Sequence, residues 1–364
     1  MIKNKSIIKT DVVVIGGGPA GMMTAGRAGA RGLSVLLLEK NKTLGKKLLI
    51  TGGGRCNLAN NIPNTRALLA KYKNSDQFLF SAFSQFGVKD TLQFFKDREL
   101  ATKEEAEGRI FPVSNKAQSV LDALVQYIKK GGVEIMTSAV VADIEADEKT
   151  KEFHIRLKDE TEIIAKSCVI ATGGTSHPET GSTGDGFVWL KNFGHKIIDN
   201  DFALVPIALK DAWAKKLSGV VLSEIRLSIF LNGKKEKKSG NRKGKLLFTH
   251  FGISGPTVLN MSKEVGELLP AGDVVIGLDL FPNIDHGELK KKLQNLLTTE
   301  SNKKIKNALG EIVTSAIVSA LLENTNIDGE TASHSIRSED RKRLVVLMKN
   351  IPLNVDGLLG TDKA

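Results

Sequence analysis

Residues 11–39, DVVVIGGGPAGMMTAGRAGARGLSVLLLE, carry the strongest structural pattern in this chain. Residues 11–15 form a short β-branched run, which is typical of a buried parallel strand. A glycine turn follows, then a helix-prone stretch at 19–31 that Gly32 is placed to end. A second apolar run occupies 34–38. This order of strand, turn, helix and strand predicts the opening unit of an α/β fold.

The glycine turn matches the spacing G-x-G-x-x-G and has a physical task at each position. Gly16 allows the tight turn, Gly18 lets the backbone approach a pyrophosphate, and Gly21 lets the helix pack against the strand. The start of the helix, which includes Ala20, offers unpaired amides and positive potential to phosphates. Glu39 follows at the end of the second strand, where it can accept hydrogen bonds from ribose hydroxyls and repel a 2′-phosphate. The pattern predicts a site for FAD or NAD rather than NADP.

The next landmark is TGGGRCN at residues 51–57. Its glycines, including Gly53 and Gly54, can expose backbone amides to an anion or a ring edge. Arg55 and Asn57 can add charge and hydrogen bonds. A mobile glycine turn with no ligand is the alternative interpretation of this segment.

The middle of the chain has the pattern of short strands separated by polar turns. Alternating runs occur at 133–136, 139–144, 153–157 and 162–165, and they predict an antiparallel β-meander inserted as a crossover. A further apolar strand at 167–171 ends in Ala171-Thr172-Gly173-Gly174.

The remaining segments predict a mixed architecture of three parts. Six phenylalanines between residues 64 and 100 suggest helices packed on the sheet, with a substrate-facing aromatic wall as the alternative. Strand-like runs follow residue 194, and a helical pattern covers 285–350. We therefore expect an FAD-binding domain at 1–193 and 352–364, an inserted β-rich, barrel-like domain at 194–283, and a small helical subdomain at 284–351.

Composition limits the classes of function. The chain has 364 residues, with 52 Lys and Arg against 41 Asp and Glu, a formal net charge of +11. This excess attracts anions, including nucleic acid, but it equally describes a solvated lysine-rich surface. The densest run, residues 234–245, contains no aromatic to stack a base and predicts a β-hairpin tip. The two cysteines indicate no disulfide framework, and we expect a cytoplasmic protein without membrane span or metal site.

Motifs spread over most of the chain resemble flavoproteins of the glutathione-reductase structural class. More narrowly, the chain is similar to the bacterial YhiN/BaiN-like family of FAD-dependent oxidoreductases. The matching segments are GGGPAGMMTA (16–25), KKLLITGGGRCNLAN (46–60), GRIFPVSNKA (108–117), ATGGTSHPETGSTGDG (171–186), LVPI (204–207) and LFTHFGISGPTVL (247–259). The resemblance implies FAD bound by a Rossmann-type N-terminal domain, with the flavin ring facing the inserted domain.

The candidate cofactor-binding residues combine the motif positions with those that the resemblance implies. They are Gly16, Gly18, Ala20, Gly21, Glu39, Lys47, Gly53, Gly54, Arg55, Asn57, Val140, Thr172, Gly173 and Gly174. The family continues beyond the position of Asp362 with a βα unit that carries a second flavin motif, whereas this sequence stops at Ala364. We therefore expect the FAD-binding domain to be incomplete, with fewer cofactor contacts.

FAD would carry the redox chemistry, and the protein would position it. We expect NAD(P)H to bind transiently and reduce the flavin at N5, which then passes hydride to a small organic substrate or electrons to oxygen. Arg55 is a candidate to stabilise anionic reduced flavin. Cys56 is a candidate thiol relay, with a packed thiol as the alternative. His177 and His250 are candidate proton donors, and a structural role is the alternative for both.

Two other functions remain open from the sequence. The net charge and the analogy of fold allow a tRNA-modifying flavoprotein, although we do not expect nucleic acid as a partner. The early end of the sequence allows a truncated relative that binds no flavin and has a non-enzymatic role. The oligomeric state stays open.

Overall fold

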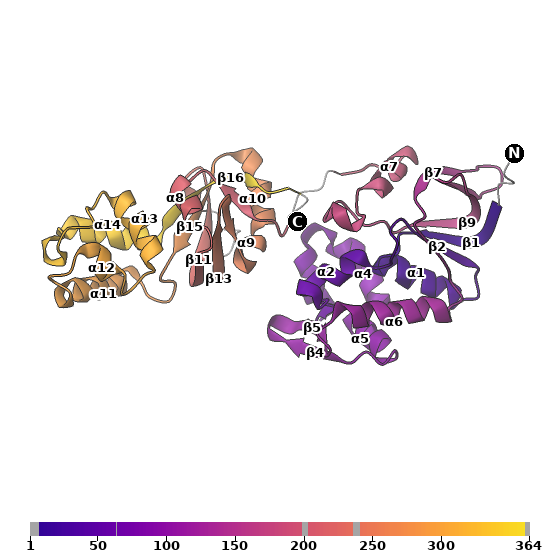
Figure 1. The fold of residues 1–364 in the computed structure, drawn as a ribbon, viewed down its shortest axis with the longest axis horizontal. Coiled ribbons are helices and arrows are strands. Elements are labelled where there is room, and N and C mark those ends of the chain that lie inside the picture. Colours follow the sequence, from indigo (N-terminus) through magenta and orange to yellow (C-terminus); the bar gives the residue numbers. More distant parts are fainter. Residues whose placement is uncertain (1–6, 63, 199–202, 236–240, 361–364) are drawn as a thin grey trace. The chain divides into compact units, whose positions relative to one another are not determined.

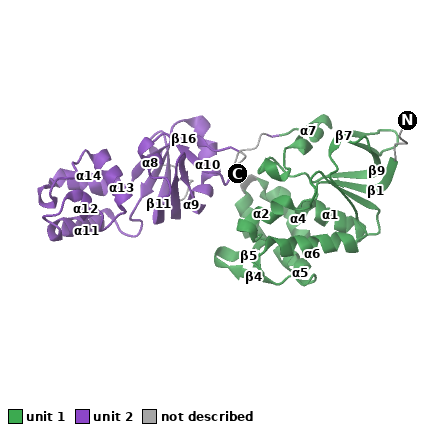
Figure 2. Ribbon diagram, viewed as in Figure 1, with its two compact units in different colours: residues 1–197 green, residues 198–364 purple. Residues whose placement is uncertain are grey.

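The computed structural model describes residues 7–62, 64–198, 203–235 and 241–360. The chain divides into two compact units, residues 1–197 and 198–364 (Figure 2). Each unit has its own sheet and its own core.

A six-stranded sheet forms the centre of the first unit (Figure 1). Its strands, in spatial order, are β6 (Glu134–Thr137), β2 (Val35–Glu39), β1 (Ile7–Ile15), β9 (Glu162–Ile170), β8 (Phe153–Leu157) and β7 (Val141–Ala146). The first four are parallel, and β8 and β7 extend the sheet antiparallel. Residues 12–15 of β1 and 35–38 of β2 are apolar on both faces because both faces are covered, and Val13, Val14 and Leu37 have no exposed surface. This arrangement confirms the predicted α/β, Rossmann-type class.

The crossover meander differs from its prediction in two strands. Residues 133–136 were assigned to the meander, but β6 is a parallel neighbour of β2, with Leu36 opposite Glu134. The runs 162–165 and 167–171 are one continuous strand, β9, which pairs with β8 along its first part and with β1 along its length. A short apolar run has the same pattern in a parallel and an antiparallel strand, so only the tertiary pairing distinguishes them.

Helices and a small sheet surround the central sheet. The helices are α1 (Pro19–Gly29), α2 (Lys46–Gly54), α3 (Thr65–Leu69), α4 (Asp76–Gln85), α5 (Val88–Lys96), α6 (Ala117–Lys130) and α7 (Asp185–Asn192), with short 3₁₀ helices η1 (Ala70–Ser75), η2 (Ala106–Gly108) and η3 (Pro178–Thr180). The small sheet has the order β3 (Ala59–Asn60), β5 (Arg109–Pro112), β4 (Thr102–Glu105). Helices α1 and α6 pack closely because Gly26 lies against the ring of Tyr127.

Replacing Gly21 by alanine is expected to destabilise the first unit by about 1–3 kcal/mol, because it overpacks the contact between α1 and β1. A Cβ atom at Gly21 would lie 1.8 Å from the carbonyl oxygen of Gly16, which is backbone and cannot move aside alone. At Gly18 a Cβ atom would meet nothing within 4 Å, so Gly18→Ala is the matched control. Urea unfolding should separate the two variants. Equal midpoints would contradict the steric argument.

The second unit contains a closed barrel of six antiparallel strands. Around the barrel they are β11 (Val221–Leu231), β13 (Arg242–Thr249), β14 (Gly252–Ser254), β10 (Ile207–Leu209), β16 (Ile351–Leu358) and β15 (Val274–Asp279), which pairs again with β11. Strand β12 (Lys234–Lys235) folds back on the end of β11 as a hairpin, while residues 236–240 of the lysine-rich run lie outside the described residues. The predicted barrel-like domain is thus confirmed as a fold.

Short helices α8 (Ala212–Lys216), α9 (Pro256–Leu259) and α10 (Ser262–Leu268), with the 3₁₀ helix η4 (Leu269–Ala271), lie beside the barrel. The helical part comprises α11 (His286–Thr299), α12 (Ile305–Leu309), α13 (Ser315–Thr325) and α14 (Ser338–Lys349), with η5 (Ser333–Ser335). Its buried residues, such as Leu293 and Leu344, join Ile276 and Phe248 of the barrel in one continuous core. The barrel and the helices therefore form a single packed body.

One domain assignment needs correction. Residues 352–364 were expected to return to the FAD-binding domain, but β16 pairs with β10 and β15 inside the barrel. Its apolar side chains alternate inward, with Leu353 fully buried and Val355 nearly so. Residues 361–364 lie outside the described residues. The other predicted boundaries stay predictions.

Candidate cofactor-binding site

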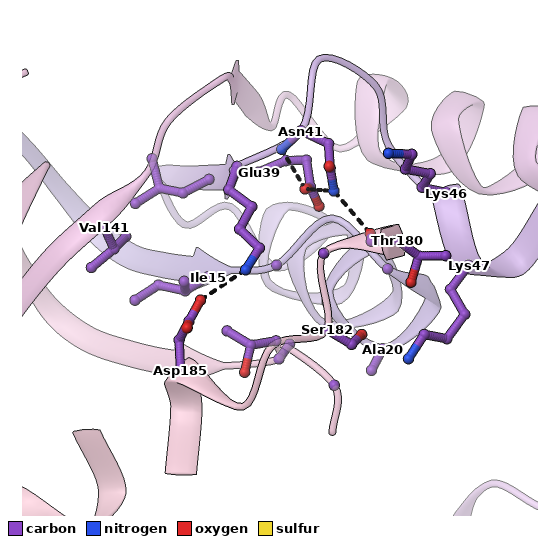
Figure 3. Close-up of a pocket in the computed structure, with 18 of the residues that line it drawn as sticks. Ile15, Ala20, Glu39, Asn41, Lys46, Lys47, Val141, Thr180, Ser182 and Asp185 are labelled. Carbon is purple, nitrogen blue, oxygen red and sulfur yellow. Dashed lines mark hydrogen bonds and ion pairs between the residues drawn. The ribbon is translucent and has the colours of Figure 1, made fainter. Parts of the chain in front are cut away.

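A cavity of about 240 Å³ lies in the first unit and includes the carboxyl ends of β1 and β2 (Figure 3). Ligands of open parallel sheets bind at this edge, where strand ends and helix starts meet. Some of the candidate residues line this cavity. They are Gly16, Gly18, Ala20, Glu39, Lys47, Val140, Thr172 and Gly173.

The glycine turn shapes one wall of the cavity. Gly16 has a φ of +110°, and a Cβ atom there would lie 2.4 Å from the carbonyl oxygen of Ala171 at the end of β9. Gly18 is the N-cap of α1 in an extended conformation, and none of the described side chains caps this helix start. Its amides and positive potential are therefore available to a bound anion. Gly21 does not line the cavity but allows α1 to approach β1, as predicted from the spacing.

Glu39 is buried and held in place by hydrogen bonds to backbone and side chain. Oε2 accepts from the amide of Gly17 at 2.8 Å, while Oε1 accepts from the amide and the Nδ2 group of Asn41, both at 2.8 Å. The carboxylate therefore joins the end of β2 to the glycine turn. A carboxylate has about four lone-pair positions, so this one can still accept a hydroxyl from a ligand in the cavity.

Residues 176–185, called the strap below, lie along the cavity and are bound to the chain just after β2. Lys40 Nζ donates to Asp185 Oδ2 at 2.8 Å and to Thr183 Oγ1 at 2.6 Å. Three side chains also donate to backbone carbonyls of the strap. Asn41 Nδ2 donates to Thr180 at 3.0 Å and Lys46 Nζ to Glu179 at 3.1 Å. Lys47 Nζ donates to Ser176. Figure 3 shows the hydrogen bond from Asn41 to Thr180, with Ser182 and Asp185 of the strap beside the pocket.

Electrostatics favour the contact between Lys40 and Asp185. Burial would raise the pKa of Asp185, but hydrogen bonds from Lys40 and Thr183 outweigh it and lower that pKa. Partial burial lowers the pKa of Lys47, and the charge of Glu179 opposes this shift. Lysines beside the cavity also favour an anionic ligand.

Replacing Lys40 by methionine is expected to speed the release of a bound dinucleotide by up to about fivefold. The Lys40–Asp185 pair is partly exposed, so its loss should cost no more than about 1 kcal/mol. Stopped-flow measurement of flavin fluorescence recovery gives the rate. Lys42→Met, at an exposed position in the same loop, is the matched control. Identical release rates in the two variants would show that the Lys40 contacts do not retain the ligand.

The TGGG segment forms a turn with an exposed backbone. Gly52, Gly53 and Gly54 have φ values of +56°, +67° and +82°, at the end of α2. A Cβ atom at Gly53 would meet nothing within 4 Å, so a ligand can approach this backbone directly. The turn is exposed and does not line the cavity of Figure 3.

Arg55 and Asn57 make contacts within the protein. Arg55 donates to both carboxylate oxygens of Glu105 at 3.0 and 3.1 Å, and its guanidinium lies 4.0 Å from the ring centre of Phe111. Burial raises the pKa of Glu105, but the hydrogen bond from Arg55 outweighs it and lowers that pKa. When the Asn57 amide is turned so that its nitrogen faces the neighbouring acceptors, it donates to the carbonyls of Ala59 and Ile110 at 2.9 and 3.1 Å. Both residues fasten the turn to the small sheet.

The remaining candidates occupy different places. Cys56 is buried in the wall of a second, apolar cavity of about 300 Å³, and burial raises the pKa of its thiol. His177 lies on the strap, with Nδ1 2.8 Å from Glu179 Oε1. His250 belongs to the second unit, where it packs against the ring of Phe251. Gly174 follows Gly173 and does not line the cavity of Figure 3.

Sequence reasoning missed the residues that close the cavity. Lys40 and Asn41 follow Glu39 directly, which was an available signal, because residues after a strand end lie near its ligand. Asp185 is the first residue of α7, after its N-cap Gly184. Among the described residues, no group of three His, Cys, Asp or Glu side chains is placed to hold a metal, and no helix is long and apolar enough to span a bilayer.

A family model and two known proteins each match most of this chain. A family model described as the HI0933-like protein Rossmann domain matches residues 10–330. The chain is 28% identical over 352 residues to a protein of Escherichia coli K12 named ribosomal RNA dihydrouridine synthase, covering 96% of this chain and 82% of that one. It is 28% identical over 356 residues to a protein of Clostridium scindens named 3-dehydro-bile acid delta(4,6)-reductase, covering 96% and 84%.

Among solved structures, the chain is similar to a 3-ketosteroid-delta4-(5alpha)-dehydrogenase from Rhodococcus jostii RHA1 in complex with 4-androstene-3,17-dione. The TM-score is 0.45 and the identity 14%, over 75% of this chain and 66% of that one.

Proposed function

Because the chain belongs to the HI0933-like family of FAD-dependent oxidoreductases, we propose that it reduces a carbon–carbon double bond conjugated to a carbonyl group. The bound nucleotide is proposed to be FAD, with its diphosphate at the start of α1. The observation that carries this proposal is the convergence of the glycine turn, the uncapped helix start and Glu39 on one cavity.

The residues present fit the adenosine diphosphate part of FAD. At Gly18 no atom lies within 4 Å of a Cβ position, which leaves room for a diphosphate against the backbone. Glu39 has acceptor capacity left for ribose hydroxyls, and its charge disfavours a 2′-phosphate. Lys40 and Lys47 add positive charge beside the cavity, and residues 180–182 and 185 of the strap form part of its wall.

The flavin end of the cofactor is proposed to lie near the TGGG turn. The exposed amides of Gly53 and Gly54 would donate to it, and Arg55, fixed by Glu105, would keep the turn open towards it. FAD, when bound, accepts a hydride from NAD(P)H and delivers it to the substrate. In the net reaction NAD(P)H is oxidised, a hydride adds to one carbon of the double bond, and a proton adds to the other.

The substrate class rests on what the two relatives' names have in common. Dihydrouridine arises from uridine by reduction of the ring double bond conjugated to a carbonyl. A 3-dehydro steroid with delta(4,6) unsaturation has double bonds conjugated to its 3-keto group. Both names thus describe addition of two electrons and two protons to an enone-like bond. The proton donor is proposed to be His177, whose ring is oriented by Glu179.

The absorption spectrum of the purified protein tests the cofactor, and a reduction assay tests the reaction. Anaerobic NADH or NADPH should bleach the flavin, and a conjugated enone should restore its colour, whereas the saturated ketone should not. A protein that stays colourless after incubation with FAD would refute the proposal. Reoxidation by oxygen alone, with no enone accepted, would indicate an oxidase instead.

A second candidate is reduction of uridine within RNA. The net charge of +11 and the name of the Escherichia coli relative favour it. Its signature is RNA binding that weakens steeply with salt, together with NAD(P)H oxidation that depends on RNA. RNA that neither binds at low salt nor stimulates NAD(P)H oxidation would exclude this candidate.

A further inference from the structure

Helix α4, whose place in the first unit Figure 1 shows, carries exposed aromatic side chains. None of its residues is buried, and Phe78 is 86% exposed and Phe80 47% exposed. Tyr72 before the helix and Phe86 after it are also more than 40% exposed. These four residues are called the aromatic surface below. The six phenylalanines of residues 64–100 were predicted to be packed core, and this prediction is wrong for Phe78, Phe80 and Phe86.

Two rings of the aromatic surface pack against another ring, and two do not. Tyr72 packs on Phe83 with ring centres 5.9 Å apart, and Phe86 packs on Phe94 at 6.4 Å. Phe78 and Phe80 have no ring partner among the described residues, so each is free to stack on a ligand. A cluster of exposed large apolar side chains is uncommon on a soluble protein and marks a binding surface.

The charges around the aromatic surface are mainly positive. Residues 64–98 contain six Lys or Arg and three Asp. Two of the carboxylates bind locally: Asp90 accepts from the amide of Gly87, and Asp97 accepts from Gln93. In the described part of the chain, no ion pair involves Arg66, Lys71 or Lys89. The segment therefore combines exposed rings with three cations that form no ion pair among the described residues.

We propose that the aromatic surface binds single-stranded RNA, with bases stacked on Phe78 and Phe80 and phosphates near Arg66 and Lys71. This inference rests on the second candidate function and names the part of the protein that would recognise the RNA. Stacked aromatic and basic side chains are the usual combination for single strands. A lipid surface fits less well because α4 itself contains no Lys or Arg. A second copy of the chain would carry the same excess positive charge.

Fluorescence anisotropy with a labelled 20-nucleotide oligouridine tests the aromatic surface in the flavin-loaded protein. Phe78→Leu should weaken binding roughly 5- to 100-fold, because leucine keeps the apolar area but cannot stack. Phe78→Trp should keep or strengthen binding. Lys71→Gln should lower the dependence of log K on log salt by roughly one, whereas Phe78→Leu should leave that slope unchanged.

Each contrary result has a distinct meaning. Equal RNA affinity of the Leu, Trp and wild-type proteins would refute stacking on α4. Wild type and Phe78→Leu could both bind anionic vesicles equally well and fail to bind RNA. That result would refute the proposal and indicate a lipid surface. NADH oxidation with a small enone should be the same in all of these proteins. If wild type does not oxidise NADH with a small enone, the proposed reductase activity is refuted, whatever the RNA result.

Discussion

Replacement of Lys349 by methionine should lower the free energy of unfolding of the second unit by about 3 kcal/mol, because it removes the nearer of the two cations that pair with the buried carboxylate of Asp279, the other being Arg226 at 3.8 Å. The side chains of Lys349 and Asp279 are 7% and 9% exposed, and their charged atoms are 2.8 Å apart. Lys349 Nζ also donates to the carbonyls of Phe281 and Ile284 at 2.7 and 2.9 Å. One ammonium group therefore ties α14 to the end of β15 and to the loop that leads into α11.

Hydrogen exchange of β15 and β16 measures this effect locally, without requiring that both units unfold together. Lys263→Met is the matched control, since Lys263 forms a surface pair with Glu267 at 3.9 Å and should change stability by less than about 0.5 kcal/mol. A double variant, Lys349→Met with Asp279→Leu, should recover much of the loss, because the buried carboxylate is then removed as well, while Arg226 keeps its hydrogen bond to the carbonyl of Pro282. Equal protection in Lys349→Met and Lys263→Met would show that the pair does not stabilise the barrel.

The opening strand–turn–helix–strand unit was predictable because its determinants are local. Positive φ at Gly16, the close contact at Gly21 and the helix start at Gly18 each depend on residues a few positions apart. Glu39 also follows from spacing, since it ends the strand next to the turn.

The closure of the site was not predictable from spacing. The strap contacts join residues more than 120 positions apart, such as Lys40 to Asp185 and Lys46 to Glu179. The partner of Arg55 was not predictable either. Its charge suggested a ligand contact, but Glu105, 50 residues away, accepts both of its hydrogen bonds. A charged side chain does not reveal its partner in the sequence, so these assignments required the tertiary structure.

The exposure of α4 could not be read from its pattern either. Phenylalanine is among the residues most often buried, and a segment rich in it predicts core. In the structure, Leu79 and Phe83 are the half-buried apolar residues of this helix, while Phe78 and Phe80 point to solvent. Whether a ring is covered depends on which elements pack against the helix.

Replacing Glu39 by alanine should weaken FAD binding by at least about 10- to 100-fold. Removal of an ionised acceptor that bonds a ligand hydroxyl costs about 1.5–3 kcal/mol, and this carboxylate also orders the site. Without it, the amide of Gly17 and two donors of Asn41 lose their acceptor. The glycine turn and the contact of Asn41 with the strap would both become less ordered.

Titration of the apo-protein with FAD, followed by flavin fluorescence, gives the dissociation constant. Glu39→Gln should also bind weakly, because its amide group would face either Gly17 or Asn41 with a donor where an acceptor is needed. Asp11→Asn is the control: Asp11 lies on the same sheet but accepts from Lys166 and Ser34, away from the cavity. Wild-type affinity in Glu39→Ala would mean that the nucleotide does not use the end of β2, and the proposed orientation of FAD would be wrong.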